Sequence, residues 1–305
     1  MAKKLRKNLL FKKGAHANNV TWTISYIYLA IICLFQIFIF AWMIYTSFKD
    51  DIDLYLDMFA LPKLNALHFE NYSNVFKLIN MEIFTENRGY VTYDIWDMAL
   101  NSVLMATLMP IHQIFATVCT AYVISKYRFK GKELLLMINL FVMVFPIVGN
   151  LASGLKINHA IGRFDNLFMM CIMGGHPFGM QLLIYINMFN GIDKTYMEAA
   201  QLDGAGHFRI FCTIMVPMVK STVIVFYVLA VLGNWSNYQT PLIWLPSYPN
   251  LALGIYDFQY NAAKYAATLP QVLAGFVIIS LPSIIFYFCN QKLIASKMVV
   301  GGLKG

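Results

Sequence analysis

The chain has 305 residues, of which 59% are apolar and only 12% are charged, about half the charged fraction of soluble domains. This composition excludes an ordinary soluble domain and is typical of an integral membrane protein. The net charge of +8 is explained by an excess of basic residues on the predicted cytoplasmic side of the membrane. It does not indicate binding to nucleic acid.

Six stretches are long and apolar enough to cross a bilayer, which takes about 20 mostly apolar residues. They are Trp22–Phe48, Met98–Ser125, Leu134–Leu155, Leu167–Ile192, Thr222–Leu245 and Leu269–Asn290. None of them contains Asp, Glu, Lys or Arg. The sequence therefore predicts an all-α integral membrane fold with six transmembrane helices.

The distribution of charge predicts that both termini are cytoplasmic. With an even number of spans, this topology places 16 of the 23 basic residues inside and 11 of the 15 acidic residues outside. Residues 1–21 then form a basic cytoplasmic N-terminus. The apolar stretch after them is longer than the core of a signal peptide, so we expect it to be retained. The basic, aromatic turn Ala121–Lys132 is interpreted as a cytoplasmic membrane anchor.

The first external segment, residues 49–95, is the longest stretch outside the predicted spans. It is acidic and aromatic, and it contains the phrase Leu67–Tyr72 (L-H-F-E-N-Y). This segment is interpreted either as a small lid on the membrane surface or as a ligand site.

Proline and glycine interrupt several of the predicted spans. Pro110, Pro146 and Pro282 predict kinks, because proline removes a backbone donor. The run Gly174–Gly179 predicts a break in the fourth span, which indicates either a binding site near the midplane or a kink for tight helix packing. His176, in this break, is either a hydrogen-bonding partner for a substrate or a satisfied interior group.

A short polar loop, residues 193–220, separates the fourth and fifth predicted spans. Asp193 is placed to cap a helix over Lys194–Asp203, and Gly204 and Gly206 are expected to end that helix, because glycine accepts left-handed dihedral angles. A second helical piece over Phe208–Met215 is expected to stop at Pro217. The loop therefore predicts a helix–turn–helix knuckle.

Three further phrases follow along the chain. Leu232–Leu242 (L-G-N-W-S-N-Y-Q-T-P-L) places polar and aromatic residues in an otherwise apolar span. The second large external loop, residues 247–268, contains Leu251–Phe258 (L-A-L-G-I-Y-D-F). The predicted cytoplasmic tail, residues 291–305, ends in Gly301–Gly305 (G-G-L-K-G).

Together these motifs resemble the permease subunits of binding-protein-dependent ABC sugar importers. The most specific likeness is the cytoplasmic coupling loop, E-A-A, three residues, G, nine residues, then I-x-V-P, with Val216 where the family usually has Leu. The phrases in residues 67–72, 121–132, 232–242 and 251–258 and the tail also match. The resemblance covers almost the whole chain, most specifically residues 193–258. It points to the carbohydrate branch, like the second permease subunit of the maltose-type importer.

The resemblance implies a type I importer permease fold for residues 22–305, in a multi-pass protein of the bacterial cytoplasmic membrane. It also implies a second homologous permease subunit, two copies of a cytoplasmic ATPase and an external sugar-binding protein as partners. The chain has no G-x-x-x-x-G-K-[ST] phosphate loop. We therefore expect no cofactor in this chain and no enzyme activity, with ATP and magnesium bound by the partner ATPase.

The resemblance implies residues that couple to the ATPase and residues that face the binding protein. A third group, the substrate pathway, is predicted from the residues themselves, because sugar sites combine aromatic faces with amide and hydroxyl groups. Those expected to couple to the ATPase are Glu198, Ala199, Ala200, Asp203, Gly204, Ile214 and Pro217. Those expected to line the substrate pathway are Asn234, Trp235, Asn237, Tyr238 and His176, with hydrogen bonding between helices as the alternative for the first four. Those expected to contact the binding protein are Tyr256, Asp257 and Tyr260, with a plain connecting loop as the alternative.

Two other classes of function are disfavoured by the sequence. An ion-coupled secondary carrier usually places Asp or Glu within the bilayer, and the predicted spans contain neither. An intramembrane enzyme would need a motif such as H-E-x-x-H or G-x-S-x-G, and the sequence has none of these.

Overall fold

The computed structural model describes residues 2–62, 66–85, 89–145 and 149–298. They fall into two compact units. One is formed by Met1–Val75 and Ala267–Val277, and the other by Phe76–Ala266 and Ile278–Gly305. The second, here called the bundle unit, contains the coupling loop and the candidate pathway. Within the predicted tail, Gly301–Gly305 lies outside the described residues.

The first unit contains the long helix α1 (Ala2–Thr46), followed by α2 (Asp51–Leu56) and the first part of α3 (Glu70–Leu78). The phrase Leu67–Tyr72 closes the turn after α1. The Asn71 side-chain amide donates to the carbonyls of Ser47 and Lys49, both at 2.9 Å. Because Asn71 is buried, these bonds satisfy carbonyls at a helix end, and they give the phrase a structural role.

Four helical segments in the described part of the chain are long and apolar enough to cross a membrane. They are Val20–Thr46, Ile95–Lys126, His207–Trp235 and Leu269–Ala295. Three of them coincide with the first, second and sixth predicted spans. The fifth predicted span, Thr222–Leu245, is only partly right, because the long helix begins earlier and ends at Trp235. The other two predicted stretches are each divided between shorter helices. These helices are α5 (Lys132–Val144), α6 (Leu151–Ala160), α7 (Leu167–Met173) and α8 (Met180–Asn190).

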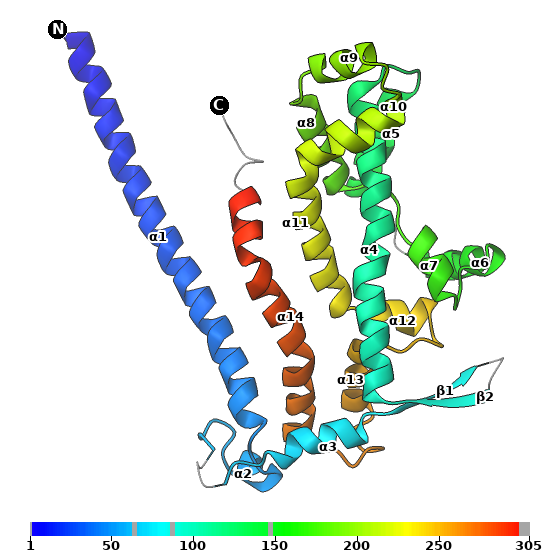
Figure 1. Ribbon diagram of the computed structural model, residues 1–305. Coiled ribbons are helices and arrows are strands. Elements are labelled where there is room, and N and C mark those ends of the chain that lie inside the picture. The colour runs from blue at the N-terminus through cyan, green and yellow to red at the C-terminus, as the bar shows by residue number, and fades with distance from the viewer. Residues whose placement is uncertain (1, 63–65, 86–88, 146–148, 299–305) are drawn as a thin grey trace. The chain divides into compact units, whose positions relative to one another are not determined.

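The bundle unit is built around α4 (Ile95–Lys126), which runs beside α8 and α11 (Val216–Trp235) (Figure 1). Its largest apolar core lies where α4 and α8 approach α11 and the segment before it. The buried members are Ile114, Val118, Ala121, Tyr122, Ile124, Leu182, Tyr185, Phe189, Met197, Ala200, Ile210, Phe211, Met215 and Val219. Burial of these side chains is the main force that holds the three helices together.

Helix α4 begins at a capping box. The Asp94 carboxylate accepts hydrogen bonds from the N–H groups of Trp96 and Asp97, both at 2.9 Å, and the Asp97 carboxylate accepts from the Asp94 N–H at 3.3 Å. These bonds satisfy donors that the first turn leaves free. Pro110 lies inside α4 and Pro282 inside α14 (Leu269–Met298), as predicted, and Pro146 lies outside the described residues.

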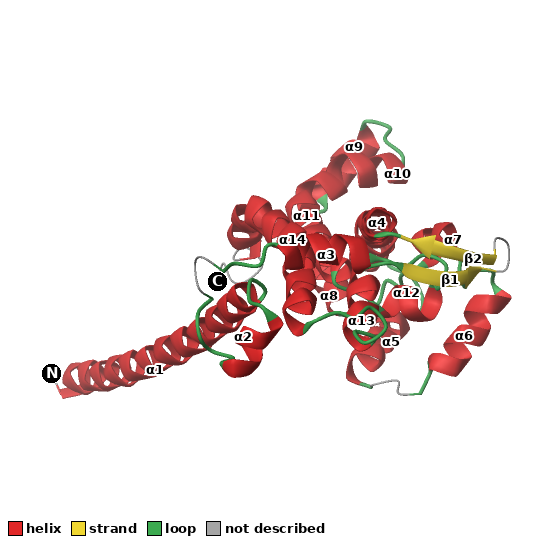
Figure 2. Ribbon diagram, turned by 90° about the horizontal axis from the view of Figure 1, so that it is seen from below, coloured by secondary structure: helices red, strands yellow, loops and turns green. Residues whose placement is uncertain are grey.

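A β-hairpin, which the sequence analysis did not predict, precedes α4. Strands β1 (Met81–Thr85) and β2 (Gly89–Tyr93) pair antiparallel, with Ile83 opposite Val91. Figure 2 shows the hairpin projecting from the start of α4. Helices α12 (Gln239–Trp244) and α13 (Leu251–Tyr260) lie at the same end of α4, and α9 and α10 lie at the other end (Figure 1).

Candidate functional site: a helical knuckle beside the end of α4

A helix–turn–helix knuckle follows α8. Its first helix, α9, spans Thr195–Leu202, and its second, α10, spans His207–Ile210. The Asp193 carboxylate accepts a hydrogen bond of 3.0 Å from the Thr195 N–H. Hydrogen bonds from Thr195 hold the pKa of Asp193 below its usual range. The predicted helix over Lys194–Asp203 is confirmed to within one residue at each end, but Lys194 takes the N-cap position predicted for Asp193.

The turn of the knuckle depends on Gly204. Its φ angle of +80° lies in the left-handed region that favours glycine. The Gly204 N–H bonds to the Gln201 carbonyl at 3.0 Å and the Ala205 N–H to the Ala200 carbonyl at 2.9 Å, which is the pairing of a Schellman cap. Gly204 thus ends α9, as predicted. Gly206 does not end α9, because it has φ −70° and begins α10 as its N-cap residue.

The knuckle divides the predicted coupling residues between two faces. Ala200 is buried and joins the apolar core. Glu198, Ala199 and Asp203 are exposed on the surface of the knuckle. Leu202 is 90% exposed, beside them in the last turn of α9. A charged group, a small residue and a bare apolar side chain on one short helix are typical of a surface that a partner covers.

The chain continues from α10 into α11 without a break. Phe211–Met215 forms a π-helix, and the Val216 N–H bonds back to the Phe211 carbonyl. Pro217 lies in the first turn of α11, directly after the π-helix, and it has no N–H to donate to the preceding turn. The prediction that the helix stops at Pro217 is therefore wrong, because the wider π turn absorbs the proline. Ile214 is half-buried and packs against the core.

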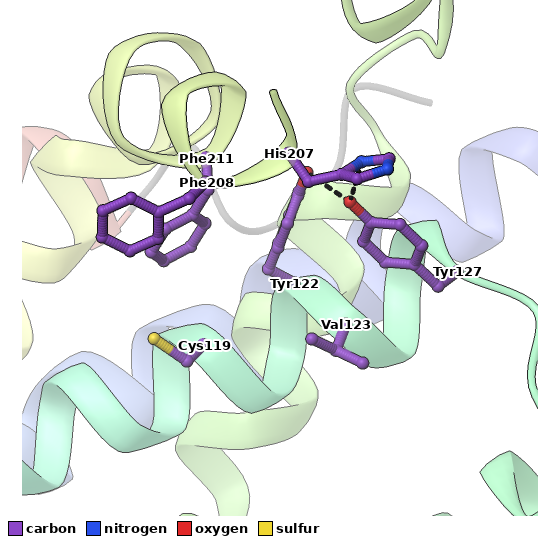
Figure 3. Close-up of a pocket in the computed structure, with 7 residues that line it drawn as sticks. All are labelled: Cys119, Tyr122, Val123, Tyr127, His207, Phe208 and Phe211. Carbon is purple, nitrogen blue, oxygen red and sulfur yellow. Dashed lines mark hydrogen bonds between the residues drawn. The ribbon is translucent and has the colours of Figure 1, made fainter. Parts of the chain in front are cut away.

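An open groove of about 470 Å³ lies beside the knuckle, where α4 ends. Its lining is almost entirely apolar, and it consists of Cys119, Tyr122, Val123, Tyr127, His207, Phe208 and Phe211 (Figure 3). The Tyr127 hydroxyl points to His207 and lies 2.9 Å from its Nδ1. The same hydroxyl lies 3.3 Å from the hydroxyl of Tyr122. The end of α4 is thus bonded directly to the knuckle.

Two of the candidate pathway residues end α11, and their polar groups have partners within the bundle unit. The Asn234 side-chain amide donates to the Ala230 carbonyl at 3.0 Å. The Trp235 indole N–H donates to the Ile279 carbonyl at 2.9 Å. The second bond links α11 to α14, which supports the helix–helix interpretation of Trp235 and leaves its role in a pathway a prediction.

The other two residues from this phrase connect α11 with α12 and α13. The Asn237 side-chain oxygen accepts from the Thr240 N–H at 3.0 Å, and the Asn237 backbone carbonyl accepts from the side-chain amide of Asn250 at 2.9 Å. The ring of Tyr238 stacks on Tyr256, with centroids 4.5 Å apart and planes 10° apart. The structure therefore brings a candidate pathway residue into contact with a candidate binding-protein contact.

The three candidate binding-protein contacts lie on α13. Tyr256 also stacks on Tyr260, with centroids 6.0 Å apart, and Tyr260 is 79% exposed. The Asp257 carboxylate accepts from the hydroxyl of Tyr265 at 2.5 Å and from the side-chain amide of Asn261 at 2.7 Å. Burial and the hydrogen bond to Asp257 raise the pKa of Tyr265. Asp257 therefore stabilises this loop, while Tyr260 is open to a partner.

The predicted break between α7 and α8 is confirmed. His176 is exposed within it. The Gly179 N–H, which no helix satisfies, donates to the Asn139 side chain at 2.6 Å. A Cβ on Gly175 would lie 2.5 Å from the Cβ of Gln113, so the break packs closely against α4. This geometry supports the packing interpretation of the break, and a substrate contact by His176 stays a prediction.

A polar clasp that the sequence analysis missed joins three segments at the other end of the bundle unit. The Asp165 carboxylate accepts from the Ser247 N–H at 2.8 Å and from the Ser247 hydroxyl at 2.6 Å. The Ser247 carbonyl accepts from the Tyr93 hydroxyl at 2.8 Å. Asp165 has φ +51°, a conformation that Asp tolerates better than most residues. The sequence shows only that Asp165 is an acidic residue in a turn, and it does not indicate that Ser247 is its hydrogen-bonding partner.

Apolar helices of membrane-spanning length, joined to a polar knuckle, define a multi-helix membrane transport component. The chain matches the model of the family described as "binding-protein-dependent transport system inner membrane component" over residues 92–300. Because this match covers most of the chain, the protein belongs to that family. The match includes the knuckle, α11 and α13, and it excludes α1, α3 and β1.

Several characterised relatives are similar over nearly their whole length. The maltodextrin transport system permease protein MalD of Streptococcus pneumoniae is 26% identical over 94% of this chain and 96% of its own. The arabinooligosaccharides transport system permease protein AraQ of Bacillus subtilis is 25% identical over 94% of this chain and 96% of its own. A solved bacterial ABC transporter for import of the acidic polysaccharide alginate shares the fold. Its TM-score is 0.68 at 20% identity, covering 90% of this chain and 97% of that one.

Proposed function

We propose that this chain is a permease subunit of an ATP-driven importer, which moves a sugar or oligosaccharide inward across the bacterial cytoplasmic membrane. The observation that carries the proposal is the knuckle. On a chain of the binding-protein-dependent family, the Schellman cap at Gly204 orders a short helix that exposes Glu198, Ala199 and Leu202. The named functions of the relatives support a sugar as the cargo.

The proposed topology has six spans and cytoplasmic termini. The four long helices supply four of them. The divided stretches 134–155 and 167–192 supply the third and fourth, as interrupted spans. A break within a bilayer requires that neighbours satisfy the freed backbone groups, and the bond from the Gly179 N–H to Asn139 supports this arrangement.

The energy comes from partner chains. Two cytoplasmic ATPases bind ATP and magnesium, and one of them docks on the exposed face of the knuckle. This chain itself hydrolyses nothing. A second, homologous permease completes the pathway, and an external sugar-binding protein delivers the cargo. A solved alginate transporter in complex with its periplasmic protein shares the fold, with a TM-score of 0.57 at 15% identity, which makes a binding-protein partner reasonable.

The transport cycle is alternating access. ATP binding draws the two ATPases together, and the knuckle converts this closure into movement of the spans, so that the pathway faces outward. Hydrolysis returns the pathway to the inward-facing state. Each state is favoured by a different set of contacts between the ATPases and the knuckle, as any ligand-driven switch requires.

The proposed pathway passes the end of α11. Asn234, Trp235, Asn237 and Tyr238 combine aromatic faces with amide groups, a mixture suited to sugars, and His176 adds an exposed imidazole. Uptake by a variant with both Trp235→Ala and Asn237→Ala tests this assignment. Unchanged affinity and rate would remove both residues from the pathway. Trp235→Phe, which deletes the bond to Ile279 and keeps a ring, is the matched control.

The proposed contact with the binding protein is on α13. Tyr260 is exposed, and its ring stacks on the ring of Tyr256. Asp257 holds the loop through Tyr265. Affinity of the binding protein for reconstituted Tyr260→Ala measures the contribution of the exposed ring.

The decisive experiment is a gentle detergent purification of the tagged chain from its native membrane, with mass spectrometry of the proteins that co-elute. The proposal expects a second permease of this family and an ATPase with a phosphate-binding loop. Ligand screening of the companion binding protein would then identify the sugar. Recovery of the chain alone, with uptake that collapses when the ion gradient is removed, would overturn the proposal in favour of an ion-coupled carrier.

A further inference from the structure

The last residue of α4, Lys126, and the C-cap residue after it, Tyr127, hold the knuckle from two sides. The Lys126 ammonium group donates to the Ile192 carbonyl at 2.5 Å, and Ile192 immediately precedes the knuckle. The Tyr127 hydroxyl is bonded to Nδ1 of His207, the first residue of α10. One bond therefore lies before α9 and the other after its turn.

Aromatic side chains connect these two bonds along one wall of the open groove. Tyr122 packs edge-on against Phe189 and Tyr127, with ring centroids 5.6 Å apart in each pair, and it lies 4.9 Å from Phe211. Tyr122 is buried. Close-packed side chains transmit a displacement rather than absorb it. If the knuckle moves as a rigid body, these contacts therefore move the end of α4 with it.

The opposite end of α4 is bonded to the segment that precedes α13. The Asn101 side-chain amide donates to the Pro249 carbonyl at 2.8 Å, and the Ser102 hydroxyl accepts from the Leu251 N–H at 2.8 Å. Both side chains are buried. At about 1.5 Å per residue, Asn101 and Lys126 lie about 38 Å apart along the helix, so α4 connects the knuckle with the region of α13.

We infer that Lys126 and Tyr127 are positioning residues, through which movement of the knuckle reaches α4 and, along α4, the loop before α13. This inference rests on the proposed function, because it assumes that an ATPase moves the knuckle. It gives the turn Ala121–Lys132, interpreted from sequence as a membrane anchor, a mechanical role. By reciprocity, an event at the outer loop reaches the knuckle by the same route.

The test uses the complete importer in proteoliposomes, with its companion binding protein loaded with the sugar that ligand screening selects. The readouts are basal hydrolysis of MgATP and its stimulation by the loaded binding protein. For Tyr127→Phe, which removes one hydroxyl, we expect basal hydrolysis within about twofold of wild type. Stimulation should fall about fivefold, mainly through loss of the hydrogen bond to His207, since the contact with the Tyr122 hydroxyl is longer.

Conservative variants separate positioning from folding. His207→Leu should lower the stimulation in the same direction as Tyr127→Phe. The double variant should be no worse than Tyr127→Phe alone, because that substitution already removes the bond to His207 together with the contact to Tyr122. His207→Asn keeps a polar group near the position of Nδ1 and should restore most of the stimulation. Tyr287→Phe, on the exposed face of α14, removes a hydroxyl elsewhere and should behave as wild type.

Two outcomes would overturn the inference. One is wild-type stimulation in Tyr127→Phe and His207→Leu. The other is loss of the ATPase from the purified complex in those variants, with no rescue by His207→Asn, which would assign the contact to assembly alone. Failure of the proposed function is a different result: the wild-type chain would retain no ATPase, and Gly204→Asp would leave uptake unchanged.

Discussion

The two ends of α4 differ in their surroundings: polar side chains are buried and hydrogen-bonded at one end, and apolar side chains are exposed at the other. At the N-terminal end, Asn250 is 1% exposed. Asn250, Asn101 and Ser102 each form a hydrogen bond with a backbone group of this chain. At the C-terminal end the knuckle leaves Leu202 90% and Phe208 75% exposed. In the first region the buried polar groups find partners within the chain, whereas the second leaves large apolar side chains exposed, which the proposed ATPase would cover. A change at the first should therefore lower stability, and a change at the second should lower coupling.

The largest effect is expected from Gly204→Asp at the knuckle. A non-glycine residue with φ near +80° is strained by about 1–3 kcal/mol, and the new carboxylate adds charge to the docking surface. We expect uptake to fall about tenfold or more while membrane insertion stays intact. Gly204→Ala is the matched control, because no atom lies within 4 Å of its Cβ, so it adds strain alone. Normal uptake by Gly204→Asp would remove the coupling role.

Asn250→Ala should give the largest loss of stability at the other end of α4. The substitution leaves the Asn237 carbonyl and the Leu253 N–H without their partner. We expect the free energy of unfolding to fall by about 2 kcal/mol, with hydrolysis by the remaining assembled complex unchanged. Thermal unfolding in detergent measures the loss. Asn80→Ala, at an exposed position, serves as control, and equal midpoints for the two variants would contradict the comparison.

The clasp between Asp165 and Ser247 should contribute less, because Asp165 is half-buried. Asp165→Ala and Ser247→Ala are each expected to lower the free energy of unfolding by about 1–1.5 kcal/mol. Since the two side chains share one contact, the losses should not add in the double variant. Full additivity in a double-mutant cycle would show that the two residues act independently.

The smallest effect is expected from Asp193→Ala at the start of α9. Hydrogen bonds from Thr195 lower the pKa of Asp193 in the folded state. Its stabilisation is therefore present above the unfolded pKa, near about 3.9, and is lost as the pH falls through the folded pKa. We expect the difference in unfolding midpoint between wild type and variant to be small at pH 7 and to vanish once the pH falls below the folded pKa of Asp193. A difference that persists at low pH would assign the effect to something other than the carboxylate.

Local patterns were sufficient for the helices and for the cap of the knuckle. The apolar stretches at residues 22–48, 98–125 and 269–290 coincide with long helices, because length and apolarity are local properties. The stretch at residues 222–245 runs past the end of its helix at Trp235. Gly204 was identified as the end of α9, since its residue type and its φ angle are linked directly. The stop predicted at Pro217 failed, because the sequence does not reveal a π turn that accommodates proline.

The sequence by itself determined the class of the protein, the four long helices, the break before α8 and the position of the knuckle. Each depends on residues close together in the chain. The tertiary structure alone decided which side chains meet: Tyr127 with His207, Asp165 with Ser247, Tyr238 with Tyr256. These pairs are separated by many residues, and polar or aromatic groups have many possible partners. Only the packing of the folded chain selects the ones that form.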